Sequence, residues 1–432
     1  MSFDLPSLPD DWAYVALDSC CKPGSITYGI VQPGAPVIGG VPIIRVNNFQ
    51  DTQLNLSEVM RVAPEVEAKY SRTKLNGGEV LLTIVGSVGQ VAVAPKKIAG
   101  FNVARAVAVI DPLPHVSAEW IALCLRSPLS QHLLGSRANT TVQTTINLKD
   151  LRALPIPLPP VDERTNIAGV IGALDDRITL LRETNATLEA IAQALFKSWF
   201  VDFDPVRAKM EGRAPEGMDV ATAALFPDSF EETELGLVPR GWTCCSLKEV
   251  CSIFDSKRVP LSGAERAKRR GPYPYYGAAA LMDYVDDYLF DGIYLLTGED
   301  GSVADEKGFP ITQYVWGKFW VNNHAHILQG KAGFSTEHLA LALRRVNIQP
   351  YITGAVQAKL SQSNMWRINV LNPGKDISVT FGALIEPLYE TVRANVEQAQ
   401  TLTTLRDTLL PRLISGQLRL PEVESQLEVA LV

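Results

Sequence analysis

Two long segments of the chain repeat apolar residues in alternating steps of three and four. The repeat runs from Ile171 to Trp199 in the first segment and from Ile385 to Leu413 in the second. This spacing is typical of a heptad seam, in which one face of an α-helix packs on a partner helix. Each segment is expected to form a helix of about 35–40 residues, roughly 50–60 Å long. The seam positions are Ile171, Leu174, Ile178, Leu181, Asn185, Leu188, Leu195, Ile385, Leu388, Val392, Asn395, Leu402 and Leu409.

One asparagine interrupts each seam, Asn185 in the first and Asn395 in the second. If the helices run antiparallel with these two residues opposite each other, the apolar positions also fall into pairs, and Leu174 then meets Arg406 in a weak layer. A buried polar pair of this kind fixes the register of a coiled coil. Two alternatives remain open: ordinary packing of each helix in a core, and two solvent-exposed asparagines.

The rest of the chain contains an internal sequence repeat. Three stretches recur in the same order, and each copy precedes one of the long helices. The third stretch is expected to form a short helix in both copies, and in both a serine suited to N-capping begins it. Between them lie short β-type runs and Gly/Pro turns. The echoes are LPDDWAYVALDSCCK (8–22) with VPRGWTCCSLKEVCS (238–252), GEVLLTIVGSVGQ (78–90) with GIYLLTGEDGSVA (292–304), and SAEWIALCLRS (117–127) with STEHLALALRR (335–345).

This pattern predicts an α+β protein with tandem duplicated mixed α/β domains, separated by an antiparallel two-helix coiled coil and related by a pseudo-two-fold axis. A chain of 432 residues is long enough for two or three domains. The expected division is a first domain (1–155), a long helix (156–204), a linker (205–237), a second domain (238–373), a second long helix (374–420) and a tail (421–432).

Composition favours a cytoplasmic protein with real hydrophobic cores. The chain is 46% hydrophobic and 20% charged, and its six cysteines show no CxxC spacing, so reduced thiols are expected. We find no signal-peptide pattern at the N-terminus and no apolar run long enough to span a membrane. The net charge is −7. Basic residues nevertheless gather in residues 69–105 and 255–270, a distribution that matters more for partners than the sum.

Three segments resemble the conserved regions of type I restriction–modification specificity subunits. Residues 156–212, which contain ALFKSWFVDFDP, are similar to the central conserved region of that family. The run ALFPDSFEETELGLVPRGW (224–242) and the C-terminal LRDTLLPRLISGQLR (405–419) are similar to its other conserved parts. The two variable stretches match the family's two target recognition domains in position and size, so the resemblance covers essentially the whole chain.

The resemblance implies a non-catalytic subunit. In that family each target recognition domain reads one half of a bipartite double-stranded DNA site, the helices form an antiparallel spacer, and methyltransferase subunits, two in all, and restriction/translocase subunits assemble around it. S-adenosylmethionine, ATP and Mg would then be bound by those partners. The aromatic strip WFVDFDP would close the helix end with Trp199, Phe200 and Phe203, and Pro205 would stop the helix before a polar link.

Candidate DNA contacts follow from residue type and position in the two variable domains. Asparagine pairs bidentately with adenine, and lysine and arginine meet phosphate. A structural turn at GSVG and a solvated basic loop are the alternatives, while the tyrosines of PYYGA resemble a loop common in these domains. The candidates are Arg45, Asn47, Asn48, Ser87, Gly89, Gln90, Lys96 and Lys97 in the first domain, and Lys257, Arg258, Lys268, Arg269, Arg270, Tyr275, Tyr276, Asn322, Asn323 and His324 in the second.

Other chemistry finds little support in the sequence. His324 and His326 stand two apart on an expected strand and would share a face, but no further ligands for a metal are indicated. We find no Walker A, GxGxxG, GxSxG, HExxH or adenine-methyltransferase tetrapeptide. Two other hypotheses stay open: a coiled-coil scaffold whose β-rich domains bind protein, and an enzyme with a diverged catalytic motif.

Overall fold

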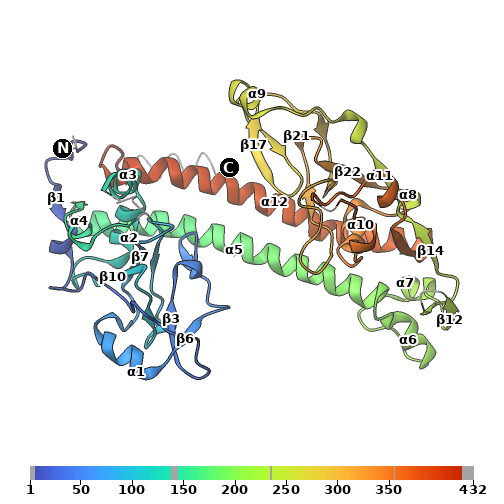
Figure 1. Ribbon diagram of the computed structural model, residues 1–432, viewed down its shortest axis with the longest axis horizontal. Helices are drawn as coiled ribbons and strands as arrows, with labels where there is room; N and C mark the ends of the chain where they lie inside the picture. Colours follow the sequence, from blue (N-terminus) through green and yellow to red (C-terminus); the bar gives the residue numbers. More distant parts are fainter. Residues whose placement is uncertain (1–4, 138–144, 234–235, 355, 421–432) are drawn as a thin grey trace. The chain divides into compact units, whose positions relative to one another are not determined.

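The computed structural model describes residues 5–137, 145–233, 236–354 and 356–420 of the chain. It divides into two compact units (Figure 1). Unit 1 comprises Met1–Leu180 and Gln398–Val432, and unit 2 comprises Leu181–Glu397. Two 40-residue helices, α5 (Val161–Phe200) and α12 (Lys375–Ile414), each contribute one half to either unit. With sheets and helices in both units, the fold is α+β.

Unit 1 is built on a four-stranded antiparallel sheet, β2-β10-β7-β8, beside the three-stranded sheet β6-β3-β9. In the second sheet, β3 pairs with β9 in parallel and with β6 in antiparallel. β7 and β10 are buried at every residue, which explains their continuous apolar letters VLLT and VAVI. The strands are β2 (Thr27–Tyr28), β3 (Val41–Ile44), β6 (Met60–Val62), β7 (Val80–Thr83), β8 (Val91–Val93), β9 (Asn102–Val103) and β10 (Val107–Ile110).

Smaller elements complete unit 1. They are the ladders β1 (Ala13–Ala16) with β11 (Pro155–Leu158) and β4 (Phe49–Gln50) with β5 (Gln53–Leu54), the helices α1 (Pro64–Glu67), α2 (Ala118–Arg126), α3 (Pro128–Arg137) and α4 (Leu148–Arg152), and the 3-10 turns η1 (Leu17–Cys20), η2 (Val46–Asn48), η3 (Ala68–Thr73) and η4 (Lys96–Ile98).

Unit 2 repeats this topology. Its sheet β15-β22-β19-β20 corresponds to β2-β10-β7-β8, and its second sheet, β17-β16-β21-β18, again contains one parallel pair, β16 with β21. The strands are β15 (Cys251–Ile253), β16 (Tyr273–Tyr276), β17 (Leu281–Val285), β18 (Phe290–Asp291), β19 (Tyr294–Gly298), β20 (Thr312–Val315), β21 (Lys318–Val321) and β22 (Ala325–Gly330). The duplication predicted from the three echoes is therefore present in the fold.

The remaining elements of unit 2 include a counterpart of the β1–β11 ladder. They are β14 (Thr243–Ser246) with β23 (Asn369–Asn372), the hairpin β12 (Phe230–Thr233) with β13 (Gly236–Pro239), the helices α6 (Asp204–Met210), α7 (Val220–Leu225), α8 (Leu247–Val250), α9 (Gly263–Lys268), α10 (Thr336–Leu343) and α11 (Gln362–Met365), and the turns η5 (Asp255–Lys257) and η6 (Gln349–Tyr351).

The serine caps predicted for the short helices are confirmed. Ser117 accepts a hydrogen bond from the Trp120 amide at 3.1 Å at the start of α2. Ser335 accepts one from the His338 amide at 3.0 Å at the start of α10. Each cap satisfies one of the backbone donors that a helix N-terminus leaves without an internal partner.

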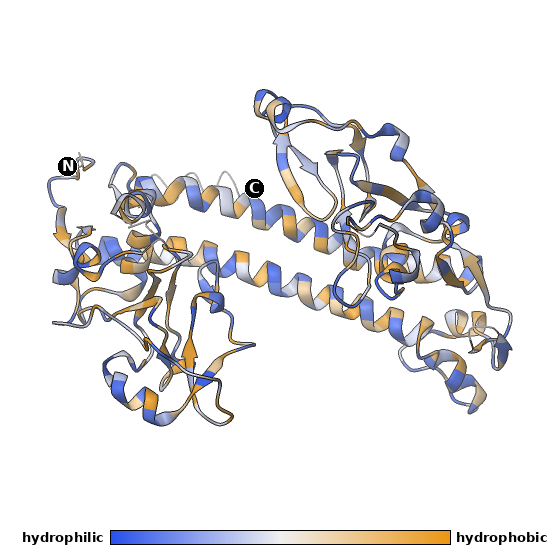
Figure 2. Cartoon of the chain, viewed as in Figure 1, coloured by the Kyte–Doolittle hydropathy of each residue, from blue (hydrophilic) through white to orange (hydrophobic). Residues whose placement is uncertain are grey.

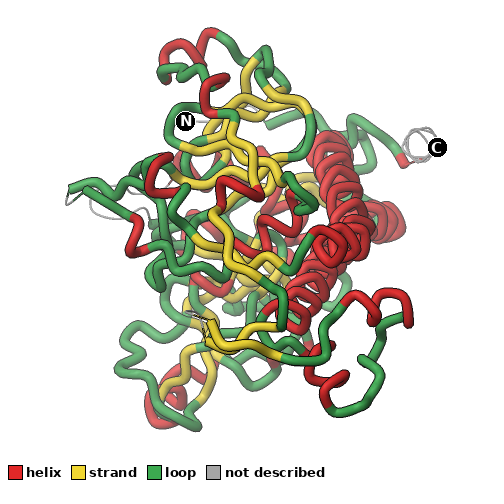
Figure 3. Tube along the Cα trace, turned by 90° about the vertical axis from the view of Figure 1, so that its right-hand side faces the viewer, coloured by secondary structure: helices red, strands yellow, loops and turns green. Residues whose placement is uncertain are grey.

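The long helices run antiparallel and side by side within each unit (Figures 1 and 3). In unit 2, Asn185 bonds Asn395 while Trp199 packs on Phe381, so the numbering rises along one helix as it falls along the other. In unit 1, Asp175 pairs with Arg406 and Glu163 with Arg419. Figure 2 shows hydrophobic residues recurring between hydrophilic ones along both helices. The heptad seam and its antiparallel register are confirmed.

The aromatic end of α5 is the core of unit 2 next to α12. Phe196, Trp199 and Phe200 pack around Phe381 of α12, with ring centroids 4.8–6.0 Å apart. The prediction that this strip closes the helix with apolar bulk is confirmed, but the role given to Pro205 is wrong. α5 already ends at Phe200, Phe203 takes a left-handed conformation with φ 57°, and Pro205 lies in the first turn of α6. Proline is compatible with the first turn because those amides have no helical acceptor.

Five of the six cysteine side chains are buried and Cys244 is exposed. All six cysteines lie in the described residues and are free. Burial is the main cause that raises the pKa of Cys21 and of Cys251 to about 12, so neither is a reactive thiolate near neutral pH. Among the helices of the described ranges, none combines the length and the apolar character needed to cross a bilayer.

Candidate nucleic-acid interface

The same three-residue connection leads into the central strand of both units. In unit 1 it is residues 104–106, entering β10, and in unit 2 it is residues 322–324, entering β22. The backbone hydrogen bonds match: Ala104 N to Ile44 O and Ile84 N to Ala106 O in unit 1, Asn322 N to Tyr276 O and Glu299 N to His324 O in unit 2. Arg105 and Asn323 are therefore the structurally equivalent middle residues.

The structural alignment of the two units differs by one residue from the alignment of the repeated sequences 78–90 and 292–304. Thr83 pairs with Val107, the first residue of β10, whereas Gly298 pairs with Ala325, the first residue of β22. Thr83 thus corresponds to Gly298 and not to Thr297, with which the repeated letters LLT align it. Strand register is set by cross-strand pairing and by which face is buried, so matching letters alone do not determine it.

In unit 1, Arg105 lines a hollow of about 490 Å³. The side chain is exposed, and within the described residues its guanidinium makes no hydrogen bond or ion pair. Ser87 also lines the hollow and is exposed, and Val46 lies between the candidates Arg45 and Asn47. The structure therefore brings Ser87 to the same hollow as Arg105, whereas Arg45 is half-buried and Asn47 is exposed on either side of Val46.

The GSVG segment is a turn organised by Thr83. The Thr83 carbonyl accepts the Gly89 amide, and its hydroxyl donates to Ser87 O and accepts the Gln90 amide at 2.9 Å. Gly89 has a φ of 97°, which favours glycine, and its carbonyl accepts from Gln131. Because these amides already have acceptors, the structural-turn alternative accounts for Gly89 and Gln90 better than a phosphate cradle does.

Three other candidates of unit 1 lie away from this edge or inside the fold. Lys96 and Lys97 are exposed on η4, at the opposite end of the β7–β8 hairpin from Ser87, beside Gly77. Asn48 is only 2% exposed. Its side chain accepts the Arg45 amide and donates to the Asn55 and Glu58 carbonyls, so it holds its own loop. The prediction that Asn48 contacts DNA does not fit this burial.

In unit 2 the three predicted readers differ in availability. Asn322 is 5% exposed, and its Oδ1 accepts the His324 amide at 2.8 Å, so it organises the connection. His324 is exposed, with Nδ1 2.5 Å from Asp300 Oδ1. Asn323 is exposed, and across the described part of the chain its side-chain amide has no hydrogen-bond partner. Of the three, Asn323 is the one free to contact a ligand.

Arg258 binds the backbone of the 322–324 connection, so its guanidinium is not available to contact phosphate. Its Nη1 lies 2.6 Å from Glu299 Oε2 and donates to Asn323 O at 3.3 Å and Ala325 O at 2.8 Å. Its Nη2 lies 3.5 Å from Asp255 Oδ2. The predicted phosphate contact for Arg258 is therefore replaced by an internal role, since its charge is neutralised by two carboxylates.

The potential ligand atoms of Asp255, Glu299 and His326 lie within 4.8 Å of one another, but they are already in use. His326 Nδ1 is 2.6 Å from Asp255 Oδ2, and Nε2 is 2.7 Å from Leu360 O, which can only accept. With Arg258 also in this cluster, the donor set is that of an ion-pair network. His324 and His326 do not share a face as predicted, because His324 precedes β22 and turns to Asp300.

The basic loop of unit 2 is largely paired with carboxylates of β17 and the turn after it. Arg269 lies 2.9 Å from Asp286, and Arg270 lies 2.6 Å from Asp283. The guanidinium of Arg269 also covers the Trp320 ring at 5.0 Å. Lys257 and Lys268 are exposed, and neither forms an ion pair with any other described residue. These two lysines are the free cations of the predicted cluster.

The tyrosines of PYYGA belong to the core. Tyr275 is 1% exposed, and its hydroxyl accepts the Leu261 amide at 3.0 Å, so the predicted DNA contact does not fit its position. Tyr276 is half-buried and packs edge-to-face on Phe319 with centroids 5.8 Å apart. Burial raises the pKa of Tyr276.

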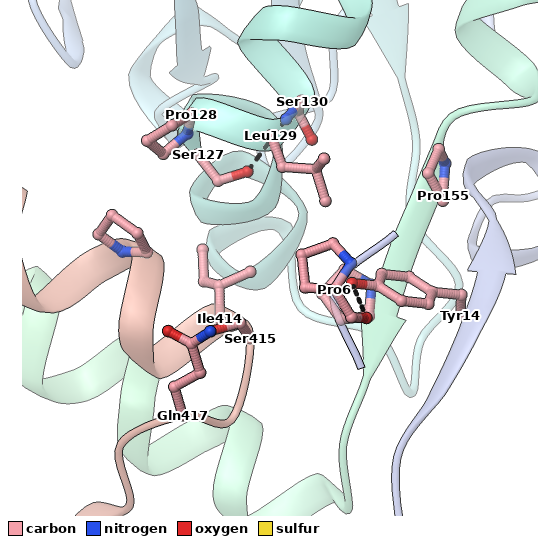
Figure 4. Close-up of a pocket in the computed structure, with 12 residues that line it drawn as sticks. Pro6, Tyr14, Ser127, Pro128, Leu129, Ser130, Pro155, Ile414, Ser415 and Gln417 are labelled. Atoms are coloured by element: carbon pink, nitrogen blue, oxygen red, sulfur yellow. Dashed lines mark hydrogen bonds between the residues drawn. The ribbon is translucent and has the colours of Figure 1, made fainter. Parts of the chain in front are cut away.

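A second hollow of unit 1 has a different character (Figure 4). It measures about 230 Å³ and is lined by five prolines together with Tyr14, Leu129 and Ile414. In the close-up, Tyr14 donates to the Pro6 carbonyl at 3.2 Å. No charged side chain lines this hollow, whereas Arg105 lines the other, so of these two hollows the one lined by Arg105 offers a guanidinium to an anion.

Sequence reasoning missed Arg105 as a site residue. It stands alone among the apolar letters of VARAVAVI, whereas most of the other candidates stand beside another candidate residue, as in Asn47–Asn48 or Lys96–Lys97. Aligning VARAVAVI (103–110) with VNNHAHIL (321–328) by their shared entry into a central strand would have paired Arg105 with Asn323. That signal depends on the register that the structure supplies.

The sequence matches one protein family in both units. Each unit contains one copy of the same mixed α/β domain together with one half of an antiparallel helix pair, which is the architecture of a duplicated two-domain protein. The model of the family described as "Type I restriction modification DNA specificity domain" matches residues 37–190 and again 239–403. The chain belongs to this family, whose general role is to bind DNA and recruit the other subunits of type I restriction–modification systems.

Curated relatives and solved structures agree. The chain is 26% identical over 345 residues to the type I restriction enzyme HindI specificity subunit of Haemophilus influenzae, covering 66% of this chain and 72% of that protein. It is 23% identical over 367 residues to the MjaIX specificity subunit of Methanocaldococcus jannaschii, covering 80% and 79%. The crystal structure of the type I S subunit from M. genitalium matches with a TM-score of 0.57 at 16% identity, covering 94% and 98%, which supports the fold.

Proposed function

We propose that the chain reads a two-part double-stranded DNA site, one half with each unit, and carries methyltransferase and restriction subunits to it. The observation that supports this most is the repeated connection into the central strand, which presents Arg105 in unit 1 and Asn323 in unit 2 on equivalent backbones. A chain that places one exposed polar side chain at the same position of two equivalent folds is suited to reading two half-sites.

Phosphate contacts come from exposed lysines that form no ion pair with another described residue. In unit 2, Lys257 and Lys268 fit this role, because Arg258, Arg269 and Arg270 are held by carboxylates. In unit 1, Lys96 and Lys97 are exposed on η4. Such contacts position a protein on the duplex without selecting a sequence. The net charge of −7 means that partner subunits contribute much of the affinity for DNA.

Partner subunits dock on the exposed faces of the long helices. Each helix keeps large apolar side chains in solvent: Leu180 and Ile191 on α5, and Val379, Leu384 and Val396 on α12. These residues lie outside the seam that joins α5 to α12. Helices that already bury their own seam leave these side chains available to a further protein partner.

Catalysis, in this proposal, belongs to the partners, which also bind S-adenosylmethionine, ATP and Mg. The test is calorimetric titration of S-adenosylmethionine into the purified chain and into its complex with the methyltransferase subunits. Binding to the complex alone supports the assignment. Stoichiometric binding to the isolated chain, or methyl transfer by it, overturns the assignment and favours the diverged-enzyme alternative.

DNA binding by the methyltransferase complex tests the positioning role. The logarithm of the binding constant is expected to fall linearly with the logarithm of salt concentration, and Lys268→Ala should reduce that slope by about one and weaken binding equally on all duplexes. Lys248→Ala, which removes an exposed lysine of α8, is the matched control and should leave the slope unchanged. Salt-independent binding would favour the protein-binding scaffold.

A further inference from the structure

The connection residues Arg105 and Asn323 differ in chemistry although they are equivalent in structure. A planar guanidinium donates two parallel hydrogen bonds, which match the O6 and N7 acceptors of guanine in the major groove. A carboxamide donates one and accepts one, which matches N6 and N7 of adenine. One position in one fold therefore carries two different base-reading groups.

Arg105 meets the requirements for a reading residue. Its amide donates to Ile30 O at 2.8 Å, and the residues on both sides are held by Ile44 and Ile84, so the backbone is fixed while the side chain is free. It lines the hollow with Ser87 and Val46 and lies in a short connection whose backbone is held by hydrogen bonds. Four arginines of unit 2, Arg258, Arg266, Arg269 and Arg270, are instead bound to carboxylates.

Asn323 is presented in a comparable way. Its carbonyl accepts from Arg258, and the neighbours Asn322 and His324 are fixed by backbone bonds to Tyr276 and Glu299. Its own amide group points to no partner among the residues that the structure describes. A reading side chain has to be held on a rigid backbone, because a misplaced hydrogen-bond donor loses its selectivity.

We propose that Arg105 determines specificity for a guanine in one half-site and that Asn323, at the equivalent position, determines specificity for an adenine in the other. This inference rests on the proposed two-part reading of DNA. It assigns the two residues to different halves of one target, so each can be changed while the other half serves as an internal control.

The test is methylation mapping in a host that expresses the chain with its methyltransferase partner. Arg105→Ala should relax one guanine position by roughly 5- to 100-fold in discrimination and leave the other half-site intact. Arg105→Lys should relax the same position, since an ammonium lacks the planar fork. Asn323→Ala should relax one adenine in the opposite half. Lys149→Ala, which removes an exposed lysine of α4, should leave the motif unchanged.

The outcomes separate this inference from the function on which it rests. A two-part motif that depends on the chain but keeps all its positions in Arg105→Ala overturns the reading role and leaves the proposed function standing. Uniform loss of methylation in a folded Arg105→Ala complex also overturns it, because a positioning contact acts on all sequences alike. If no motif depends on the chain, the proposed function itself fails.

Discussion

Asn185 of α5 and Asn395 of α12 face each other, with Asn395 Nδ2 2.8 Å from Asn185 Oδ1. Asn185 also donates to the Val392 carbonyl at 3.2 Å and is only 8% exposed. The pair lies inside the seam of unit 2 and uses both ends of the Asn185 carboxamide. A slip of either helix by one heptad would place each carboxamide against an apolar side chain, so the pair selects one register.

Replacing only one of the two asparagines is expected to lower the free energy of unfolding more than replacing both. Asn395→Leu leaves the Asn185 oxygen buried without its donor and should lower the free energy of unfolding by about 1–3 kcal/mol. The double variant Asn185→Leu/Asn395→Leu should recover most of that loss. Urea unfolding of the parent chain, the two single variants Asn185→Leu and Asn395→Leu, and the double variant measures the coupling energy. The exposed Gln398→Leu is the control. Additive effects in the cycle would show that the two residues are not coupled.

The layer next to Leu174, expected to be weak because it faces Arg406, is completed by Asp175. The Asp175 carboxylate lies 2.8 Å from Arg406 Nη1 and 3.0 Å from Arg126 Nη1, which joins α12, α5 and α2 of unit 1. Asp175→Asn removes the carboxylate that Arg126 and Arg406 share and leaves Arg406 with Asp407 alone, so it should destabilise the chain by about 1–3 kcal/mol. Asp176→Asn, the exposed neighbour, is the control. Equal unfolding midpoints for the two variants would contradict this role.

Arg258 should behave as a positioning residue of unit 2. Arg258→Met removes the shared partner of the half-buried Asp255 and Glu299 and frees the Asn323 carbonyl. Because Asp255 keeps His326 and Glu299 keeps Lys359 as partners, the free energy of unfolding should fall by about 1–3 kcal/mol. Reading of one half-site should weaken with it. Lys257→Met, at the next residue, removes an exposed charge and should change neither the unfolding midpoint nor the bases read. A uniform loss of affinity in Arg258→Met with unchanged stability would instead indicate a direct phosphate contact.

His338 makes unit 2 sensitive to acid. Burial among Phe334, Phe200 and Phe381 lowers the pKa of His338 to about 3. The ordinary value of 6.5 applies in the unfolded chain, so the unfolded state binds the extra proton. The stability from neutral His338 is complete above about pH 6.5 and is lost as the pH falls towards 3, by about 1.4 kcal/mol per pH unit. His338→Leu should show a correspondingly shallower slope between pH 6 and 4. Parallel slopes would contradict the assignment.

Periodicity predicted the helical half of the fold well. Heptad spacing can be recognised in the sequence of one helix without knowing which helix packs against it. Because the two asparagines also indicate the register, the helix pairing could be predicted from the sequence alone. The serine caps were predictable for the same reason. The aromatic strip after α5 was only half predictable, because proline is as common in the first turn of a helix as it is after the end of one.

The candidate site was harder to predict, because availability depends on contacts remote in sequence. Arg269 and Arg270 form part of an unbroken basic run, yet Asp283 and Asp286 reach them from the neighbouring strand. Asn48 is a polar residue whose hydrogen bonds are all internal. Arg105 could be matched to Asn323 only after strand pairing had fixed the register, one residue away from the match of letters.

Methylation mapping tests the central claim most directly. A host carrying the chain and its methyltransferase partner should contain methylated sites with one two-part motif, both halves of which disappear when the chain is deleted. Exchanging the unit 1 domain for that of a relative should replace one half of the motif and preserve the other. A methylation pattern that is unchanged by deletion, or a motif whose two halves always change together, would contradict the account.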